Sequence, residues 1–162
     1  MTRARQDHPA TEFRVEPMRS EDLAEVLAIE VASFSLPWTE EMFTGELTAD
    51  ALGGVLVARA PAAGAPSVLG YICVWLVTDE LHINNLAVHP RWRKRGIARE
   101  LLRTALEQGR RRGARVAFLE VRASNVAAQN LYRTCDFEPV GVRPRYYTHP
   151  VEDAVIMRRT RL

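Results

Sequence analysis

The order of apolar and polar positions changes period several times along the chain. Alternation or short apolar runs, both typical of β-strands, occupy residues 13–18, 53–60, 68–77, 81–88, 116–121, 139–143 and 154–158. Only short turn-prone stretches separate the three segments between 53 and 88, so these segments predict a β-meander. The segment 116–121 is almost continuously apolar, which is typical of a strand covered on both faces.

Apolar residues at helical spacing indicate four helices. Ser20 and Thr39 are the expected N-caps of the first two, whose apolar positions are Leu23, Val26, Leu27, Ile29 and Val31, then Met42, Phe43 and Leu47. The third begins at Gly96, carries an apolar stripe over 97–106 and ends at Gly113, a residue suited to a left-handed C-terminal conformation. The fourth covers about 126–135, with Ser124 or Asn125 as its cap.

The resulting order is strand, two helices, three strands, helix, strand, helix and two strands. This order predicts an α/β fold with a mixed sheet and helices on both faces. Residues 1–11 are polar and have no period that would bury a face, so we expect a mobile N-terminal tail. Residues 12–162 are enough for one sizeable core, and we expect a single domain.

Composition narrows the function. With 47% hydrophobic residues and a formal net charge of +2, the chain has too small a cationic excess to bind polyanions with its whole surface. No apolar run approaches the roughly 20 residues of a membrane span, and the N-terminus lacks the apolar core of a signal peptide, so we expect a cytoplasmic protein without a membrane role. Cys73 and Cys135 are expected to be buried, reduced thiols.

The positive charge is concentrated in one stretch, HPRWRKRGIARELL, at residues 89–102. A strand leads into it, a glycine lies at its centre and a helix follows. Such a turn presents free backbone N–H groups and the positive end of the helix dipole, which together attract phosphate. A solvated basic face or a nucleic-acid patch is the alternative, but neither needs Gly96 at the helix start. The nucleotide-binding patterns with Gly-Lys-Ser/Thr or Gly-x-Gly-x-x-Gly are absent.

Residues 93–98, RKRGIA, resemble the Arg/Gln-x-x-Gly-x-Gly/Ala signature of the GNAT acetyltransferases, whose backbone amides hold the pyrophosphate of acetyl-CoA. The stretches PWTEEMF, LAVHPRWRKRGIARELL, FLEVRASNVAAQNLY and RYYTHPVEDAVIM resemble the RimI-type branch of that family. This branch acetylates protein N-termini, notably the N-terminal Ala of a small-subunit ribosomal protein. The resemblance covers about residues 12–160 and implies a GNAT-like, mostly antiparallel central sheet.

The resemblance also assigns roles. It makes Glu120 the proton acceptor and Tyr132 the proton donor to the coenzyme sulfur. It places the cofactor against Leu86, Ala87, Val88, Arg93, Lys94, Arg95, Gly96, Ile97, Ala98, Arg99 and Asn125. The residues alone leave other readings open. Glu120 is a single carboxylate in an apolar strand, where desolvation is expected to raise its pKa, but an ion pair with Arg122 or another arginine is the alternative. Tyr132 fits a core position, and Asn125 fits a helix N-cap.

Two aromatic-rich segments, SLPWTEEMF and RPRYYTHP, are expected to be loops that bind the acceptor. Trp38, Tyr146 and Tyr147 would wall a slot for a peptide N-terminus, or serve as hydrophobic plugs. The chain departs from the family's commonest residues at four positions, of which the alanine at 98 is one that the family tolerates. Ala98 adds a methyl group to the phosphate turn, Asp136 replaces a glycine at a helix end, and Asn84 and Asn85 stand where more apolar residues are expected.

The leading hypothesis is therefore an acetyl-CoA-dependent N-terminal acetyltransferase that acts on the N-terminal Ala of a ribosomal protein. A lysine side chain or a small amine is an alternative acceptor. A non-catalytic module that binds coenzyme A or RNA is the alternative from another class. We expect a monomer with no nucleic-acid role. We also expect no metal, because Glu80 and His82 alone do not make a metal site.

Overall fold

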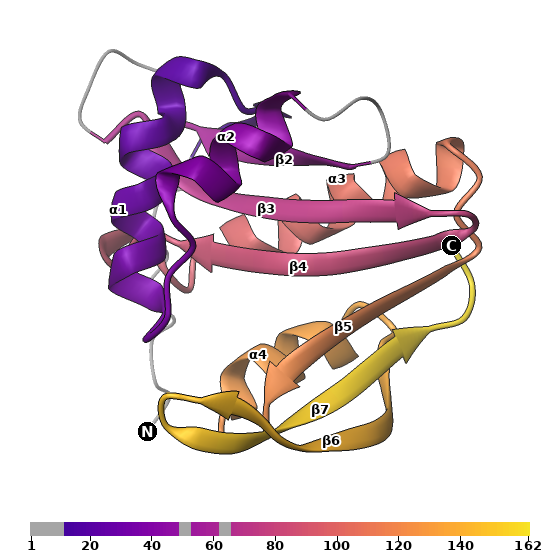
Figure 1. Cartoon of the computed structure of the whole chain (residues 1–162). Helices are drawn as coiled ribbons and strands as arrows, with labels where there is room; N and C mark the ends of the chain where they lie inside the picture. Colours follow the sequence, from indigo (N-terminus) through magenta and orange to yellow (C-terminus); the bar gives the residue numbers. More distant parts are fainter. Residues whose placement is uncertain (1–11, 49–52, 62–65) are drawn as a thin grey trace, which may run out of the picture.

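The computed structural model describes residues 12–48, 53–61 and 66–162, and in this part of the chain seven strands form one sheet (Figure 1). The strand order is β1-β2-β3-β4-β5-β7-β6, and all neighbours are antiparallel except β4 and β5. The strands are β1 (Arg14–Pro17), β2 (Gly53–Arg59), β3 (Val68–Val77), β4 (Glu80–Val88), β5 (Val116–Arg122), β6 (Glu138–Thr148) and β7 (Val151–Arg159). The predicted meander and the mixed, mostly antiparallel sheet are confirmed. The expected tail at 1–11 lies outside the described residues.

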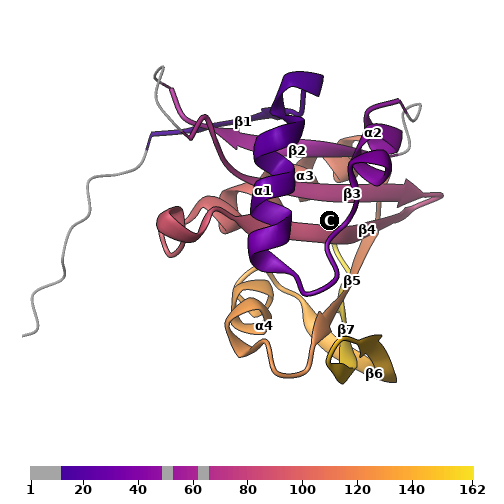
Figure 2. The same ribbon diagram turned by 60° about the vertical axis from the view of Figure 1, so that its left-hand side comes forward.

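Helices lie on both faces of this sheet, as predicted (Figure 2). On one face, which we call the front, α1 (Leu23–Ser33) and α2 (Glu40–Thr48) cover β2, β3 and part of β4. On the back, α3 (Ile97–Arg111) packs against β3 and β4, while α4 (Val126–Arg133) follows β5. Short 3-10 turns, η1 (Ser20–Asp22) and η2 (Pro90–Trp92), precede α1 and α3. Each face therefore has its own buried cluster, and no helix of the described residues covers β5 and β7 on the front (Figure 1).

The N-terminal helix differs from its prediction at one position. Val31 was assigned to the apolar stripe, but its exposed fraction is 65%, whereas Glu30 is fully buried. The first helix also begins through η1 rather than from a side-chain cap at Ser20. Thr39 does cap α2, since its hydroxyl accepts a hydrogen bond from the Met42 amide at 3.4 Å.

The C-terminal strands correct two further predictions. β5 is not covered on both faces. Ala117, Leu119 and Val121 are buried against the back, while Glu120 on the front is exposed. The segment RPRYYTHP is not a loop, because β6 continues through it to Thr148. β6 is the outer strand of the sheet, and its register with β7 is irregular between 143 and 147, so the chain tolerates a proline there.

Three turn and burial predictions are confirmed. Gly113 ends α3 with a φ of +100°, and Asp136 adopts a φ of +64° after α4. Cys73 and Cys135 are buried free thiols. Within the described ranges, no helix is both long and apolar enough to cross a lipid bilayer.

A buried ion pair fastens η1 to the sheet. Arg59 on β2 donates two hydrogen bonds to the Asp22 carboxylate, at 2.9 and 2.7 Å, and the Arg19 amide donates a third at 2.8 Å. Burial alone would raise the pKa of Asp22, but these hydrogen bonds outweigh burial and hold that pKa below its usual value. Arg59 also pairs with Glu16 on β1. The start of α1 is thus fixed by charge as well as by packing.

Candidate active site

The sheet opens between its two parallel strands. The β4–β5 ladder joins Glu80–Ile83 to 116–119 and stops there. Figure 1 shows the two arrows close together at their starting ends and apart at their tips. β4 also carries an additional residue at this place: Cys73 on β3 faces Asn85, and Val74 faces Ile83, so Asn84 forms a β-bulge. Beyond the bulge, the edge of β4 that faces β5 has no strand partner among the described residues.

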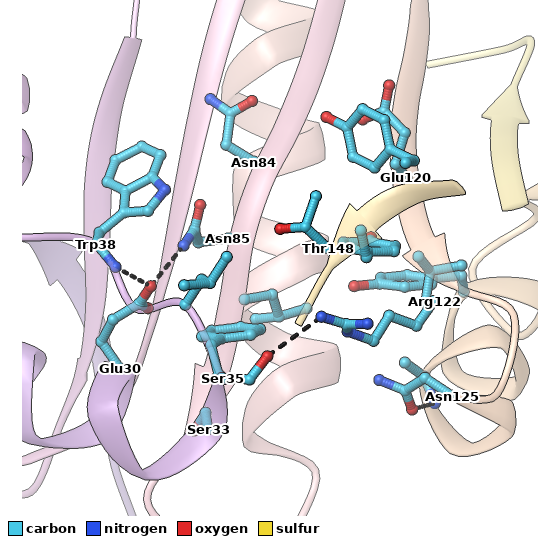
Figure 3. A pocket seen from close by; sticks show the side chains of 18 residues that line it. Glu30, Ser33, Ser35, Trp38, Asn84, Asn85, Glu120, Arg122, Asn125 and Thr148 are labelled. Atoms are coloured by element: carbon cyan, nitrogen blue, oxygen red, sulfur yellow. Dashed lines mark hydrogen bonds between the residues drawn. The ribbon is translucent and has the colours of Figure 1, made fainter. Parts of the chain in front are cut away.

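A pocket of about 380 Å³ occupies this opening (Figure 3). Its walls come from α1 and the loop after it, from β4 and β5 where they diverge, from α4, and from β6. The lining residues are Glu30, Ser33, Phe34, Ser35, Leu36, Trp38, Asn84, Asn85, Leu86, Glu120, Val121, Arg122, Asn125, Ala128, Tyr132, Tyr146, Tyr147 and Thr148. The pocket brings together seven of the residues that the sequence singled out for the site: Trp38, Leu86, Glu120, Asn125, Tyr132, Tyr146 and Tyr147.

Glu120 reaches the pocket from the front face of β5 (Figure 3). The prediction that this carboxylate is desolvated in an apolar strand is wrong, because the exposed fraction of the Glu120 side chain is 33%. Strand alternation places Glu120 on the face that no helix covers. An ion pair is present, with Arg143 on β6 at 3.5 Å. Arg122, the partner considered from sequence, instead lies 3.5 Å from Glu152.

Helix α4 contributes two polar side chains to the same pocket. Asn125 caps the helix, since its Oδ1 accepts a hydrogen bond from the Ala128 amide at 3.1 Å, and its side chain also lines the pocket. The exposed fraction of Tyr132 is 8%, and its ring centroid lies 6.0 Å from that of Phe137. The core position expected from the pattern is therefore confirmed. Burial raises the pKa of Tyr132 well above its usual value, which keeps the phenol neutral at physiological pH.

The turn before α3 has the backbone form that an anion site requires. Gly96 caps the helix with a φ of +81°, and Lys94 also has a positive φ of +60°. The Glu100 amide is the first to bond back into the helix, to the Gly96 carbonyl at 3.1 Å. The amides of residues 97–99 therefore have no acceptor in the described part of the chain. These three N–H groups lie at the positive end of a fifteen-residue helix.

The cationic side chains of this turn are used in different ways. Arg93 is occupied, donating to the Val88 carbonyl at 3.1 Å and to the Ser33 hydroxyl at 3.1 Å. Arg95 lies over the Trp92 ring at 4.6 Å. Lys94 and Arg99 are exposed. Arg93 therefore braces the turn against β4 and α1, and the others contribute positive charge at its surface.

The aromatic residues predicted for the acceptor side lie together at the pocket. Tyr146 and Tyr147 contact each other edge to face at 5.1 Å, and Arg122 lies 4.2 Å over the Tyr147 ring. Arg122 also donates to the Ser35 hydroxyl and the His149 carbonyl, each at 3.2 Å. One guanidinium thus connects β5, the loop after α1 and the β6–β7 turn. Trp38 both lines the pocket and packs on Phe43 at 5.2 Å, which combines the two roles considered for it.

Sequence reasoning missed the most deeply buried polar group of the pocket. Glu30 has no exposed surface, and its carboxylate accepts hydrogen bonds from the Trp38 amide at 2.9 Å and from Asn85 Nδ2 at 3.1 Å. The signal was available, because Glu30 lies four residues after Val26 and so falls on the buried stripe of α1. Asn85 was noted only as a departure from the family pattern. It is buried on the α1 side because the bulge turns it there.

His82 and Glu80 are hydrogen-bonded at 3.0 Å on the front of β4, and the His82 ring stacks on Phe118 at 5.8 Å. Over residues 12–48, 53–61 and 66–162, no three His, Cys, Asp or Glu side chains are grouped as metal ligands.

Comparisons with known proteins agree with this geometry. A Bacillus subtilis protein, named provisionally as a [ribosomal protein bS18]-alanine N-acetyltransferase, is 38% identical over 147 residues, which is 91% of this chain and 95% of that protein. The Escherichia coli enzyme with that name is 31% identical over 145 residues, 88% of this chain and 94% of its own. The crystal structure of the E. coli ribosomal-protein alanine N-acetyltransferase superposes with a TM-score of 0.80 at 27% identity, covering 93% of this chain and 96% of that chain.

The sequence also matches a protein-family model over residues 23–137, a range that begins with α1 and ends just after α4. This range contains the unpaired edge of β4, the turn at Gly96, and both Glu120 and Tyr132. The chain therefore belongs to the Acetyltransferase (GNAT) family.

Proposed function

We propose that this protein transfers the acetyl group of acetyl-CoA to the α-amine of a protein N-terminus, with the N-terminal Ala of a small-subunit ribosomal protein as the acceptor. One observation carries the proposal. The pocket where β4 and β5 diverge holds a carboxylate and a phenol, and β4 leads from it to free helix amides. The names of the B. subtilis and E. coli relatives support the acceptor. A ribosomal acceptor also agrees with a cytoplasmic location.

The chain fits the cofactor at two places. The amides of residues 97–99 and the positive φ of Gly96 suit a pyrophosphate. The unpaired edge of β4 at Leu86 and Ala87 suits an amide-containing arm that hydrogen-bonds like an added strand. Lys94, Arg95 and Arg99 would raise the local concentration of an anionic ligand. Bound acetyl-CoA supplies the acetyl thioester.

Glu120 is our candidate for the general base. An α-amino group has a pKa of about 8 and is largely protonated at neutral pH, so it must lose a proton before it can attack a carbonyl carbon. The Glu120 carboxylate would accept that proton, directly or through a water molecule. Arg143 holds the carboxylate at the pocket by their ion pair. The pairing and the catalytic role are compatible, because Glu120 stays partly exposed.

Tyr132 is our candidate for the general acid. Burial raises its pKa, so the hydroxyl keeps its proton at physiological pH and is available as a donor. It would donate to the coenzyme sulfur and stabilise the negative charge that develops there as the C–S bond breaks. Tyr132 lines the same pocket as Glu120, so one group would take a proton on the acceptor side and the other would give one on the donor side.

The acceptor would enter between the loop after α1 and the end of β6. Trp38, Tyr146 and Tyr147 line this side, and Arg122 fixes the two segments relative to each other. A non-catalytic module would not need Glu120 to face the pocket. Such a module is further distinguished by tight RNA binding with a steep salt dependence.

The test is acetyl-CoA turnover on short peptides that differ only in the first residue, with an N-terminally blocked, Lys-containing peptide as the control. We expect the Ala peptide to react fastest and the blocked peptide not to react. Acetylation of the blocked peptide at a rate equal to that of the Ala peptide would refute the α-amine acceptor and favour a lysine acetyltransferase.

A further inference from the structure

A buried carboxylate beside the pocket is bonded only by uncharged donors. Glu30 Oε1 accepts from the Trp38 amide and from Asn85 Nδ2, and Oε2 accepts from the Tyr71 hydroxyl. Burial raises the pKa of Glu30, although the hydrogen bonds from Trp38 and Asn85 oppose that rise. In the described part of the chain Glu30 has no cationic partner, and burying a carboxylate in that way costs free energy. The three donors come from the loop after α1, from β4 and from β3.

The contact with Asn85 fixes which way its amide points. The NH₂ group of Asn85 is the donor to Glu30 Oε1, at 3.1 Å, so the amide oxygen faces away from Glu30. Figure 3 shows the nitrogen turned to Glu30 and the oxygen turned the other way. Asn85 retains 9% exposure and lines the pocket.

The amide oxygen of Asn85 is an acceptor that nothing in the described part of the chain uses. The hydrogen bond between Asn85 and Glu30 uses the amide nitrogen of Asn85 and not its oxygen. No fully buried side-chain oxygen among the described residues lacks a partner, so Asn85 Oδ1 keeps some accessible surface, and Asn85 lines the pocket. The site therefore contains an oriented hydrogen-bond acceptor opposite Glu120, with Trp38 beside it (Figure 3).

We propose that Asn85 Oδ1 accepts a hydrogen bond from the acceptor nitrogen, and that Glu30 is the positioning residue that holds the Asn85 amide in this orientation. The inference rests on the proposed function. An α-ammonium group carries three N–H bonds. After one proton passes to Glu120, two N–H bonds and a lone pair remain. An acceptor that holds one N–H restricts rotation of the amine, so that the lone pair is directed at the acyl carbon.

A double-mutant cycle tests the proposal. The variants are Glu30→Met, Asn85→Leu and the two combined, assayed for kcat and KM with the Ala-initiated peptide and with acetyl-CoA. Asn85→Leu keeps the size of the side chain and removes the acceptor. We expect it to lower kcat/KM for the peptide about 10- to 100-fold, as for one hydrogen bond to a charged group. The KM for acetyl-CoA should stay within about twofold.

Glu30→Met should lower kcat/KM for the peptide in the wild-type background, because methionine offers no oxygen to the Asn85 NH₂ group and leaves the Asn85 amide free to turn. In the Asn85→Leu background it should have no further effect. Tyr71→Phe is the matched control. It removes a donor from Oε2 and leaves the Asn85 contact on Oε1, so we expect lower thermal stability with peptide kcat/KM within about twofold of wild type.

Each of the following results would contradict one part of the proposal. Wild-type kcat/KM for Asn85→Leu would exclude the hydrogen bond to the acceptor. Equal losses from Glu30→Met in both backgrounds would show that Glu30 acts through the loop at Trp38 and not through Asn85. If Asn85→Leu does not fold, Asn85→Ala takes its place in the cycle. A wild-type protein that binds acetyl-CoA but acetylates no α-amine would remove the proposed function itself.

Discussion

Gly96 and Gly113 flank helix α3 and offer a matched pair of substitutions. Both have a positive φ, +81° and +100°, and at both an added Cβ would meet no atom of the described residues within 4 Å. An L-residue in this left-handed region costs about 1–2 kcal/mol. For a domain of this size that cost lowers Tm by about 2–8 °C. Gly96→Ala and Gly113→Ala should therefore destabilise the protein by similar amounts.

The two substitutions should differ in their effect on ligand binding. The Gly113 amide donates to the Arg110 carbonyl at 3.1 Å, whereas Gly96 precedes the three amides without an acceptor. Relief of the strain at residue 96 would turn these amides away from a bound pyrophosphate. A hydrogen bond to a charged group is worth about 1.5–3 kcal/mol, so the loss of one weakens binding roughly 10- to 150-fold.

Calorimetric titration with acetyl-CoA and thermal unfolding of the same samples measure both effects. We expect Gly96→Ala to raise the Kd at least about tenfold and Gly113→Ala to leave it within about twofold. If both variants lower Tm by the same amount and all three proteins bind acetyl-CoA equally, the amides of the first turn of α3 do not hold the pyrophosphate.

Two further predictions concern catalysis and acid stability. Glu120→Gln and Tyr132→Phe should each lower kcat about 10²- to 10⁴-fold with an unchanged Kd for acetyl-CoA; weaker binding with normal turnover of the bound complex would contradict their roles. Asp22→Asn should lower the free energy of unfolding in urea by about 3 kcal/mol, because it breaks a buried pair with Arg59. The depressed pKa of Asp22 means that this stability is present above about pH 4 and is lost as the pH falls through the lower folded-state value. Wild-type stability should therefore fall in acid more steeply than that of Asp22→Asn, and parallel pH profiles of the two proteins would exclude the linkage.

The order of elements and the sheet class could be predicted because local periods and caps carry that information. The bounds of β3 agree with the prediction at both ends, and Thr39, Asn125 and Gly113 have the cap positions expected of them. The turn at Gly96 was expected from the combination of strand, glycine and helix, and the structure adds that Gly96 has a φ of +81°. These features depend on residues that are close neighbours in the sequence.

The predictions failed where contacts between segments that are distant in the sequence determine the structure. The spacing of Glu30 from Val26 indicates a buried position, but only its partners on β3, β4 and the loop after α1 explain how a carboxylate is accommodated there. Whether a helix covers the front of β5 depends on where α1 and α2 end in space, so the exposure of Glu120 was not legible from its apolar neighbours. Pro144 suggested a loop, but an outer strand has one edge free of hydrogen bonds and accommodates it.

The additional residue at Asn84 has a consequence for how this protein can change. Before Asn84, odd-numbered residues of β4 such as Ile83 pack on the back of the sheet. After Asn84, even-numbered residues such as Leu86 pack there. Removing one residue from this segment would send every later side chain of the strand to the opposite layer, with Asn85 leaving Glu30. Substitutions here alter single contacts, but an insertion or deletion rearranges both cores at once. In β4, the length of the strand is therefore under stronger constraint than the identity of any one of its residues.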